Sequence, residues 1–483
     1  RVLAPLGTID FWFVVDDMSP NFSCYGETAV QTPNVDRLAR EGTRFKHAFI
    51  TAPVCSPSRS AMITGMYQTT IGSHHHRSGR GELRIRLPEG ISPVPELFKK
   101  AGYHTCIGSG LPGLDHAGLP LKEGRSALGK TDYNFDWESP LYDGPDWSTR
   151  KPGQPFFMQV QLHGGKLREI NGPESLSRRA EKLFTTALNP DAFRLPPYYP
   201  SDPVIIQDWH AYLDAVRLTD HHVGAVLDRL DSEGIKDNTL VIFMTDHGIS
   251  HARGKQFLYN EGTHIPFVVR GPKVPVGKER DDLIEHIDMA PISLAAAGIP
   301  IPTNMQGKDV LAPEYRPRQH VHAARDRCDE TVERIRSVRS DRFLYIKNFH
   351  PRRPHLQPNA YKDAKLIIKR LRELHDAKSL SPLQESLLFS GERPEEELYD
   401  WREDPWQTKN LAAMPDHLET LTTMRATLTS WIRETRDKGP ESEAMYDSDM
   451  TVYLGKRKAT SSDKPSPVQQ NITQMKRWAA EGR

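Results

Sequence analysis

Cysteine is scarce in this sequence, with only four residues in a chain of 483. So few cysteines in so long a chain do not build the disulfide framework of a small secreted domain. We therefore expect mostly buried thiols, with room for one bridge. The sequence also lacks an apolar run of about 18 residues, so we expect no membrane-spanning segment.

An excess of charge of either sign is absent as well. Lysine and arginine total 64 residues, and aspartate and glutamate total 63. This balance predicts no nucleic-acid partner and no anionic membrane surface as a partner. An anionic substrate would have to be held by a local cluster of cations. No signal peptide is visible and the chain begins at Arg1, so we expect a leader to have been removed or left out and the protein to be periplasmic or secreted.

The order of apolar segments predicts an α/β fold followed by a smaller unit. Strand candidates alternate with amphipathic helical stretches up to about residue 300, which is typical of a mostly parallel sheet covered by helices. Beyond about residue 320, short strand-like runs and two helices indicate an α+β unit, and the last segment has few apolar residues. The expected division is a main catalytic domain over 1–320, an α+β subdomain over 321–440 and an extended tail over 441–483.

Two apolar runs end in residues that bind metals. The first run leads into Asp16 and Asp17, and the second leads into Asp246 and His247. Each run is typical of a buried strand, and ligands gather at the carboxyl ends of parallel strands. An isolated Asp pair after a strand is more often a helix N-cap or a turn. Two such strand ends together favour a site for a divalent cation.

The segment from Cys55 to Gly65, CSPSRSAMITG, carries the most specific pattern in the chain. One interpretation is a reduced core cysteine followed by a proline turn and a helix. The pattern of a Cys, a Pro two residues on and an Arg two further also resembles the signature of type I sulfatases. In that family a maturation enzyme, the formylglycine-generating enzyme, oxidises the Cys to formylglycine, whose hydrate is the nucleophile.

The resemblance implies a metal site. By resemblance, Asp16, Asp17, Asp246 and His247 are metal ligands, joined by an oxygen of the modified Cys55. Acidic oxygen ligands favour a hard ion, so the resemblance implies one Ca²⁺. The family most often has Asn at the position of His247, and the imidazole nitrogen leaves the choice of metal more open.

The resemblance also implies cations around the sulfate group. Arg59 is expected beside residue 55 as a fixed cation with several donors. Lys255 resembles the family's lysine that holds a sulfate oxygen and helps to protonate the leaving group. Lys130, in the segment GKTDYNF, resembles the active-site lysine of bacterial relatives, and Asp132 stands where many sulfatases have His.

Two residues compete for the role of the family's catalytic His. The strand over residues 156–162 resembles the strand that ends in this His, and a gap-free alignment puts Lys166 at its position and His163 at an earlier, variable one. An imidazole transfers protons near neutral pH better than a lysine of ordinary pKa does. The sequence therefore favours His163, with Lys166 as a sulfate contact. The run His74 to His76 is interpreted as a polar loop or as lining of a substrate pocket.

Taken over most of the chain, the resemblance implies both a fold and a reaction. The implied fold is an alkaline-phosphatase-like α/β sandwich, with a large mixed, mostly parallel sheet covered by helices and a smaller C-terminal α+β domain. The implied reaction is hydrolysis of a sulfate ester of a sulfated carbohydrate, such as a glycosaminoglycan, with release of inorganic sulfate. Segments such as 397–412 look closest to the heparan N-sulfatase (sulfamidase) branch and its bacterial relatives.

Three alternatives remain open on the sequence. The first is a sulfamidase that cleaves an N–S bond of N-sulfoglucosamine. The second is a phosphomonoester or phosphonate monoester hydrolase of the same superfamily. The third is a relative that binds sulfated glycans and is never modified.

Overall fold

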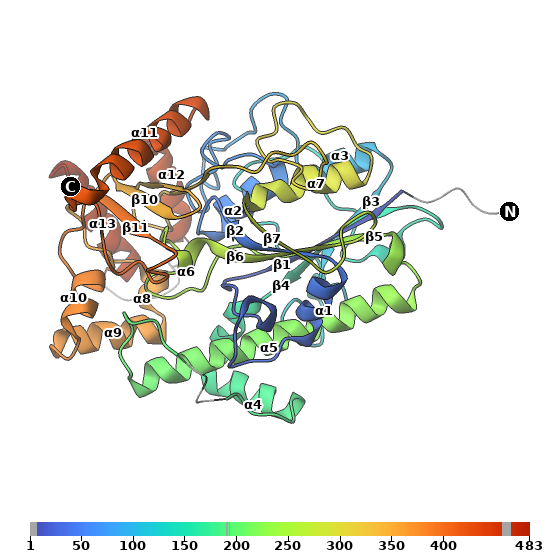
Figure 1. The fold of residues 1–483 in the computed structure, drawn as a ribbon, viewed down its shortest axis with the longest axis horizontal. Coiled ribbons are helices and arrows are strands. Elements are labelled where there is room, and N and C mark those ends of the chain that lie inside the picture. Colours follow the sequence, from blue (N-terminus) through green and yellow to red (C-terminus); the bar gives the residue numbers. More distant parts are fainter. Residues whose placement is uncertain (1–6, 190–191, 193, 456–464) are drawn as a thin grey trace.

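A seven-stranded sheet forms the centre of the structure, a computed structural model that describes residues 7–189, 192, 194–455 and 465–483 (Figure 1). The strand order is β3-β4-β1-β5-β6-β2-β7. The strands are β1 (Ile9–Val15), β2 (Thr43–Phe49), β3 (His104–Gly108), β4 (Phe156–Leu162), β5 (Thr239–Thr245), β6 (His264–Arg270) and β7 (Lys278–Glu285). Strands β3, β4, β1 and β5 run parallel, and β6 is antiparallel to both of its neighbours.

Helices cover both faces of this sheet, which explains why β1 and β5 are apolar throughout. Every residue of these two strands is buried. One face packs against α1 (Pro33–Glu41) and the long α5 (Pro203–Ser232), and the other packs against α2 (Cys55–Thr64), α3 (Val94–Lys100) and α7 (Met289–Ala296) (Figure 1). Shorter helices are α4 (Pro173–Leu183) and α6 (Asn260–Thr263).

A second, antiparallel sheet follows along the chain, with strand order β11-β10-β9-β8. Its strands are β8 (Val321–Arg325), β9 (Ile335–Arg339), β10 (Phe343–Asn348) and β11 (Glu396–Asp400). The helices of this part are α8 (Ala360–Asp363), α9 (Leu366–Asp376), α10 (Pro382–Leu388) and α11 (Leu418–Glu434). The two sheets and their helices confirm the expected α/β sandwich with a smaller C-terminal α+β part.

The segment 441–483 differs from the extended tail that the sequence predicted. It contains α12 (Glu443–Gly455) and α13 (Pro467–Ala480). The few apolar residues are placed to be buried, as Met475 and Trp478 are, and charged residues anchor the rest. Arg327 is fully buried, and its Nη2 donates to Glu441 at 2.9 Å and to Asp449 at 2.7 Å. In a sequence, charged residues that form buried ion pairs look the same as charged residues on the surface, so the pattern predicted an extended tail.

The cysteines and the helices bear on two expectations from the sequence. All four cysteines carry free thiols, so no bridge forms. Within the described ranges, no helix combines the length and the apolarity that crossing a membrane requires.

Asp10, inside β1, makes the stability of this fold depend on pH. Its side chain is fully buried, and burial raises its pKa to about 8. In the unfolded chain the pKa is about 3.9. Between these values the native state keeps a proton that the unfolded state releases, so the free energy of unfolding falls as pH rises through this window.

We expect Asp10→Asn to remove this dependence. Relative to the variant, the wild-type protein should lose about 1.4 kcal/mol of stability for each pH unit across the window. Urea unfolding at pH 5 and pH 8 measures the difference, with the exposed Asp237→Asn as the matched control. Parallel pH curves for the wild type and Asp10→Asn would contradict a buried, protonated Asp10.

Candidate active site

The carboxyl ends of β1 and β5 bring the two acidic pairs together. The strands are adjacent and parallel, so the residues that follow them meet at one edge of the sheet. The backbone N–H of Asp17 donates to Asp246 Oδ1 at 3.1 Å. Asp17 turns the chain here in the left-handed region, with φ of 52°, a conformation that non-glycine residues adopt at a cost of about 1–3 kcal/mol.

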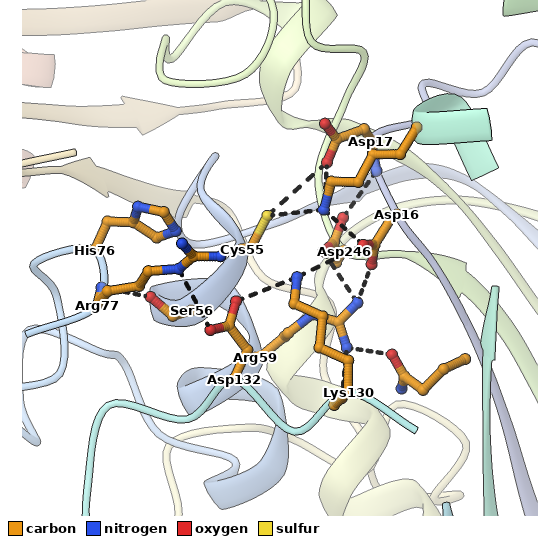
Figure 2. Close-up of polar contacts among 12 residues, drawn as sticks. Asp16, Asp17, Cys55, Ser56, Arg59, His76, Arg77, Lys130, Asp132 and Asp246 are labelled. Atoms are coloured by element: carbon orange, nitrogen blue, oxygen red, sulfur yellow. Dashed lines mark hydrogen bonds and ion pairs between the residues drawn. The ribbon is translucent and has the colours of Figure 1, made fainter. Parts of the chain in front are cut away.

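Cys55 begins α2 and points toward this edge (Figure 2). Its Sγ lies 3.2 Å from His247 Nε2 and 3.9 Å from Asp17 Oδ1. One ligand atom from each of Asp17, Cys55, Asp246 and His247 lies within 4.8 Å of the other three. Four of the five predicted metal ligands therefore converge.

This group has the properties of a cation site. It offers two carboxylates and an imidazole, all buried. Burial, together with the charges of Asp16 and Cys55, raises the pKa of Asp246 to about 6. Its Oδ2 is buried without a hydrogen bond and has an ion pair with Arg59. A carboxylate in this position would be stabilised by a cation, and hard divalent ions suit its oxygens.

Asp16, the fifth predicted ligand, lies among positively charged side chains. Lys166 Nζ donates to its Oδ2 at 2.6 Å, Lys130 Nζ lies 3.5 Å from the same oxygen, and Arg59 donates to Oδ1. Burial alone would raise the pKa of Asp16, but these cations hold it well below its usual range. Asp16 thus fixes the cations in the site.

Arg59 joins α2 to both strand ends. It lies one helical turn after Cys55 and is completely buried. Its Nη2 donates to Asp16 and is 3.2 Å from Asp246 Oδ2, and its Nη1 donates to Gln161 on β4. The predicted place beside residue 55 agrees with this geometry.

Lysines surround residue 55 and favour a negative charge there. The Nζ atoms of Lys255 and Lys166 lie 3.2 Å and 3.5 Å from Cys55 Sγ. Burial would raise the pKa of the Cys55 thiol, but the charges of Lys130, Lys166 and Lys255 keep it well below its usual value. An anion bound at this point would meet the same cations.

The structure brings Lys166 to residue 55 and leaves His163 apart. The His163 ring packs on His116 with 4.4 Å between ring centroids, and burial and His116 lower its pKa to about 4. In the described part of the chain, no hydrogen bond or ion pair links the His163 side chain to Cys55. The 3₁₀ helix η3 (Gly164–Glu169) turns the chain back to Asp16.

Two glycines allow this return. A Cβ at Gly164 would overlap the carbonyl oxygen of Asp16, and a Cβ at Gly165 would overlap that of Asp17. The pair Gly164-Gly165 lets η3 pack directly on the acidic strand end and project Lys166 into the site. The sequence signal for this return of the chain is the glycine pair itself. The choice of His163 over Lys166 did not take this pair into account.

The sequence predicted His76 only as part of a polar loop or of a pocket lining, and it did not reveal the partner of this histidine. His76 Nδ1 lies 3.0 Å from Asp329 Oδ1, and Tyr453 donates to the same carboxylate at 2.9 Å. His76 Nε2 is buried without a hydrogen bond, and a ring nitrogen of His76 lies within 4.8 Å of Cys55 Sγ and of an Asp132 oxygen. The histidine run was visible in the sequence, but its partners follow more than 250 residues later.

Comparisons with known proteins agree with this geometry. Residues 11–299 match the family model of sulfatases, and residues 247–355 match the model described as N-sulphoglucosamine sulphohydrolase, C-terminal. An ulvan-active sulfatase of Formosa agariphila is 30% identical over 476 residues, covering 89% of this chain and 76% of the relative. N-sulphoglucosamine sulphohydrolase of Homo sapiens is 27% identical over 476 residues, covering 88% and 89%.

A solved structure described as a complex with its substrate D-glucosamine-2-N,6-O-disulfate has the same fold, with a TM-score of 0.62 at 17% identity. The match covers 91% of this chain and 100% of that one. The sulfatase model spans more than half of the chain and includes Cys55 and both acidic strand ends. These findings confirm what the Cys55 pattern predicted: the chain belongs to the sulfatase family and is a sulfatase.

Proposed function

We propose that this enzyme hydrolyses a sulfate ester of a sulfated carbohydrate and releases inorganic sulfate. The observation that carries the proposal is the buried residue 55, which has the amines of Lys166 and Lys255 within 3.5 Å of its sulfur and belongs to a group that can hold a cation. A dianionic sulfate group needs positive charge of this kind around its oxygens. Relatives named for ulvan and for N-sulphoglucosamine support a saccharide as the substrate class.

We propose that the formylglycine-generating enzyme converts Cys55 to formylglycine. The hydrate of that group supplies one oxygen to attack sulfur and a second oxygen through which sulfate is expelled. The position at the start of α2 supports this role, because Arg59 and the lysines of the site are already directed at it.

We propose one Ca²⁺ as the metal. Asp17, Asp246 and His247 would hold it together with residue 55. The bound ion would neutralise charge on the sulfate oxygens. Asp16 would contribute through Lys166 and Arg59, which it holds in place.

The protein's own side chains would hold the substrate and move the protons. Lys130, Lys166 and Lys255 are placed to hold non-bridging oxygens. Although burial lowers it, the charges of Asp17 and Cys55 keep the pKa of Lys255 well above its usual value, so Nζ stays positively charged and can donate a hydrogen bond to the sulfate or to the leaving oxygen. His76 Nε2, with Nδ1 oriented by Asp329, is placed to accept a proton at residue 55.

A second candidate function is cleavage of an N–S bond. The match of residues 247–355 to the C-terminal part of N-sulphoglucosamine sulphohydrolase favours it. The geometry around residue 55 serves either bond, since both place a sulfuryl group at the same cations. Parallel assays with O-sulfated and N-sulfated glucosamine decide between the two.

The first experiment tests whether sulfate release depends on the modification of Cys55. Protein made together with a formylglycine-generating enzyme should lose about 18 Da at the Cys55 peptide, and sulfate release should rise with the modified fraction. Cys55→Ala should abolish release, because the nucleophile is removed, while the matched Cys24→Ala should retain it. Full activity of Cys55→Ala, or faster turnover of phosphate esters than of sulfate esters, would overturn the proposal. A thiol that stays unmodified would favour a binding protein.

Metal binding is expected to be visible without turnover. Adding Ca²⁺ to metal-free protein should raise the melting temperature, since a ligand at a hundredfold excess over Kd adds about 2.7 kcal/mol of stability. Asp246→Ala should lose this shift. Asp208→Ala is the matched control, because Asp208 is buried and ion-paired outside the group, with Arg168. An equal Ca²⁺ shift in both variants would contradict the assigned ligands.

The same substitution in two histidines tests the proton carrier. His76→Gln should lower kcat about a hundredfold with little change in KM, because a ring nitrogen of His76 lies near residue 55, whereas the His163 side chain packs on His116. His163→Gln should lower kcat less than about fivefold, which is well below the effect of losing a general base. Steady-state kinetics on matured protein measure both. Loss of activity in His163→Gln with a normal His76→Gln would reverse the assignment.

A further inference from the structure

A cleft of about 640 Å³ opens beside residue 55 between the loops 77–84 and 129–137. It begins at the catalytic group, because Lys130 and Asp132 line it, and Lys130 Nζ lies 3.2 Å from Asp132 and 3.5 Å from Asp16. Figure 2 shows Arg77, Asp132 and Lys130 next to Cys55. Its volume is within the usual range of small-molecule sites.

Positive charge exceeds negative charge in the lining of this cleft. Asp132 is shared by Lys130 at 3.2 Å, Arg80 at 2.7 Å and, more distantly, Arg77 at 3.8 Å. The cleft is lined by four cations and two carboxylates: Arg77, Arg80, Arg84, Lys130, Asp132 and Asp136. In a chain of balanced charge, this is a local cluster of the kind that an anionic substrate requires.

The backbone that carries Arg77 and Arg80 is held in place before any ligand binds. Arg77 and Asp132 both adopt left-handed backbone conformations, with φ of 54° and 55°. Such strained residues persist only where the surrounding structure holds them, and they cluster at binding sites. Helix α12 supports the loop, since Asp449 accepts from the backbone N–H of Arg80 at 3.2 Å and a Cβ at Gly81 would overlap the carbonyl oxygen of Ser448. Fixed donors lose less entropy on binding.

Trp137 adds an apolar surface at the same cleft. Its side chain is 39% exposed, and its ring meets Tyr133 edge-on at 5.7 Å between centroids. A large exposed indole next to charged donors suits a ligand with one apolar face and polar substituents, as a sugar ring has.

We propose that this cleft binds a second anionic group, a carboxylate or a sulfate, on the sugar next to the one whose sulfate is attacked at residue 55. The inference rests on the proposed function, because it takes Lys130 as a ligand of the attacked sulfate. It narrows the substrate class to a polyanionic saccharide of at least two sugars. Arg84 would bind the second anion, since its side chain is exposed and its guanidinium pairs with the exposed Asp136, at 2.6 and 2.9 Å. An exposed ion pair of this kind contributes little, so an incoming anion can compete with Asp136.

Binding to a catalytically inert protein tests this inference. Calorimetry on the Cys55→Ala protein would use two probes, a fully sulfated heparin disaccharide and glucosamine 6-sulfate. We expect the disaccharide to bind at least about tenfold more tightly, because a second charge-assisted contact forms. Adding Arg84→Gln should weaken the disaccharide about tenfold and the monosaccharide less than about twofold. Trp137→Ala should weaken both probes.

Arg342→Gln is the matched control. Arg342 is also exposed and paired with one aspartate, at 2.7 Å from Asp400, but it lies outside the cleft. Equal affinities for the two probes, or equal losses in Arg84→Gln and Arg342→Gln, would overturn the inference. A melting temperature within the wild-type range shows that each variant is folded. If the matured protein bound the disaccharide through Arg84 but released no sulfate, the inference about the cleft would stand and the proposed function would be wrong.

Discussion

The guanidinium of Arg59 holds together α2 and the ends of two strands, and the rest of the site is arranged around this contact. Removing the charge of Arg59 would leave Asp16 and Asp246 buried without their shared partner. Breaking a buried ion pair in this way costs about 3–5 kcal/mol, far more than an exposed pair contributes. Lys166 and Lys255 are likewise paired with buried carboxylates. Because each charge has a partner of opposite sign, many charges can be buried beside one nucleophile.

The parts of this site that the sequence could predict are those set by local rules. Apolar strands that end in acids predict a cation site near Asp17 and Asp246, and the resemblance of the Cys55 segment to the sulfatase signature implies the individual roles. The choice between His163 and Lys166 depended on the path of η3, which a pattern of residue types does not specify. The partner of His76 could not be predicted, because Asp329 and Tyr453 are brought to it only by the folding of distant segments.

The active site has two structural sources. The large sheet and α2 supply the nucleophile, the potential metal ligands and Arg59. The C-terminal part supports the site in two places. Asp329 contacts His76, and α12 contacts the loop 77–84. Because α12 is anchored by the buried Arg327, the position of the loop depends on an ion-pair network that also reaches the backbone of His76.

This arrangement bears on what a shortened form of the enzyme would retain. A chain ending before α12 would keep every residue within the two matched family regions, 11–299 and 247–355. It would still lack the carboxylate of Asp449 behind Arg80 and the hydroxyl of Tyr453 behind Asp329. A change in this last segment would therefore alter both the support of the loop 77–84 and the support of His76, although it lies outside the two matched family regions.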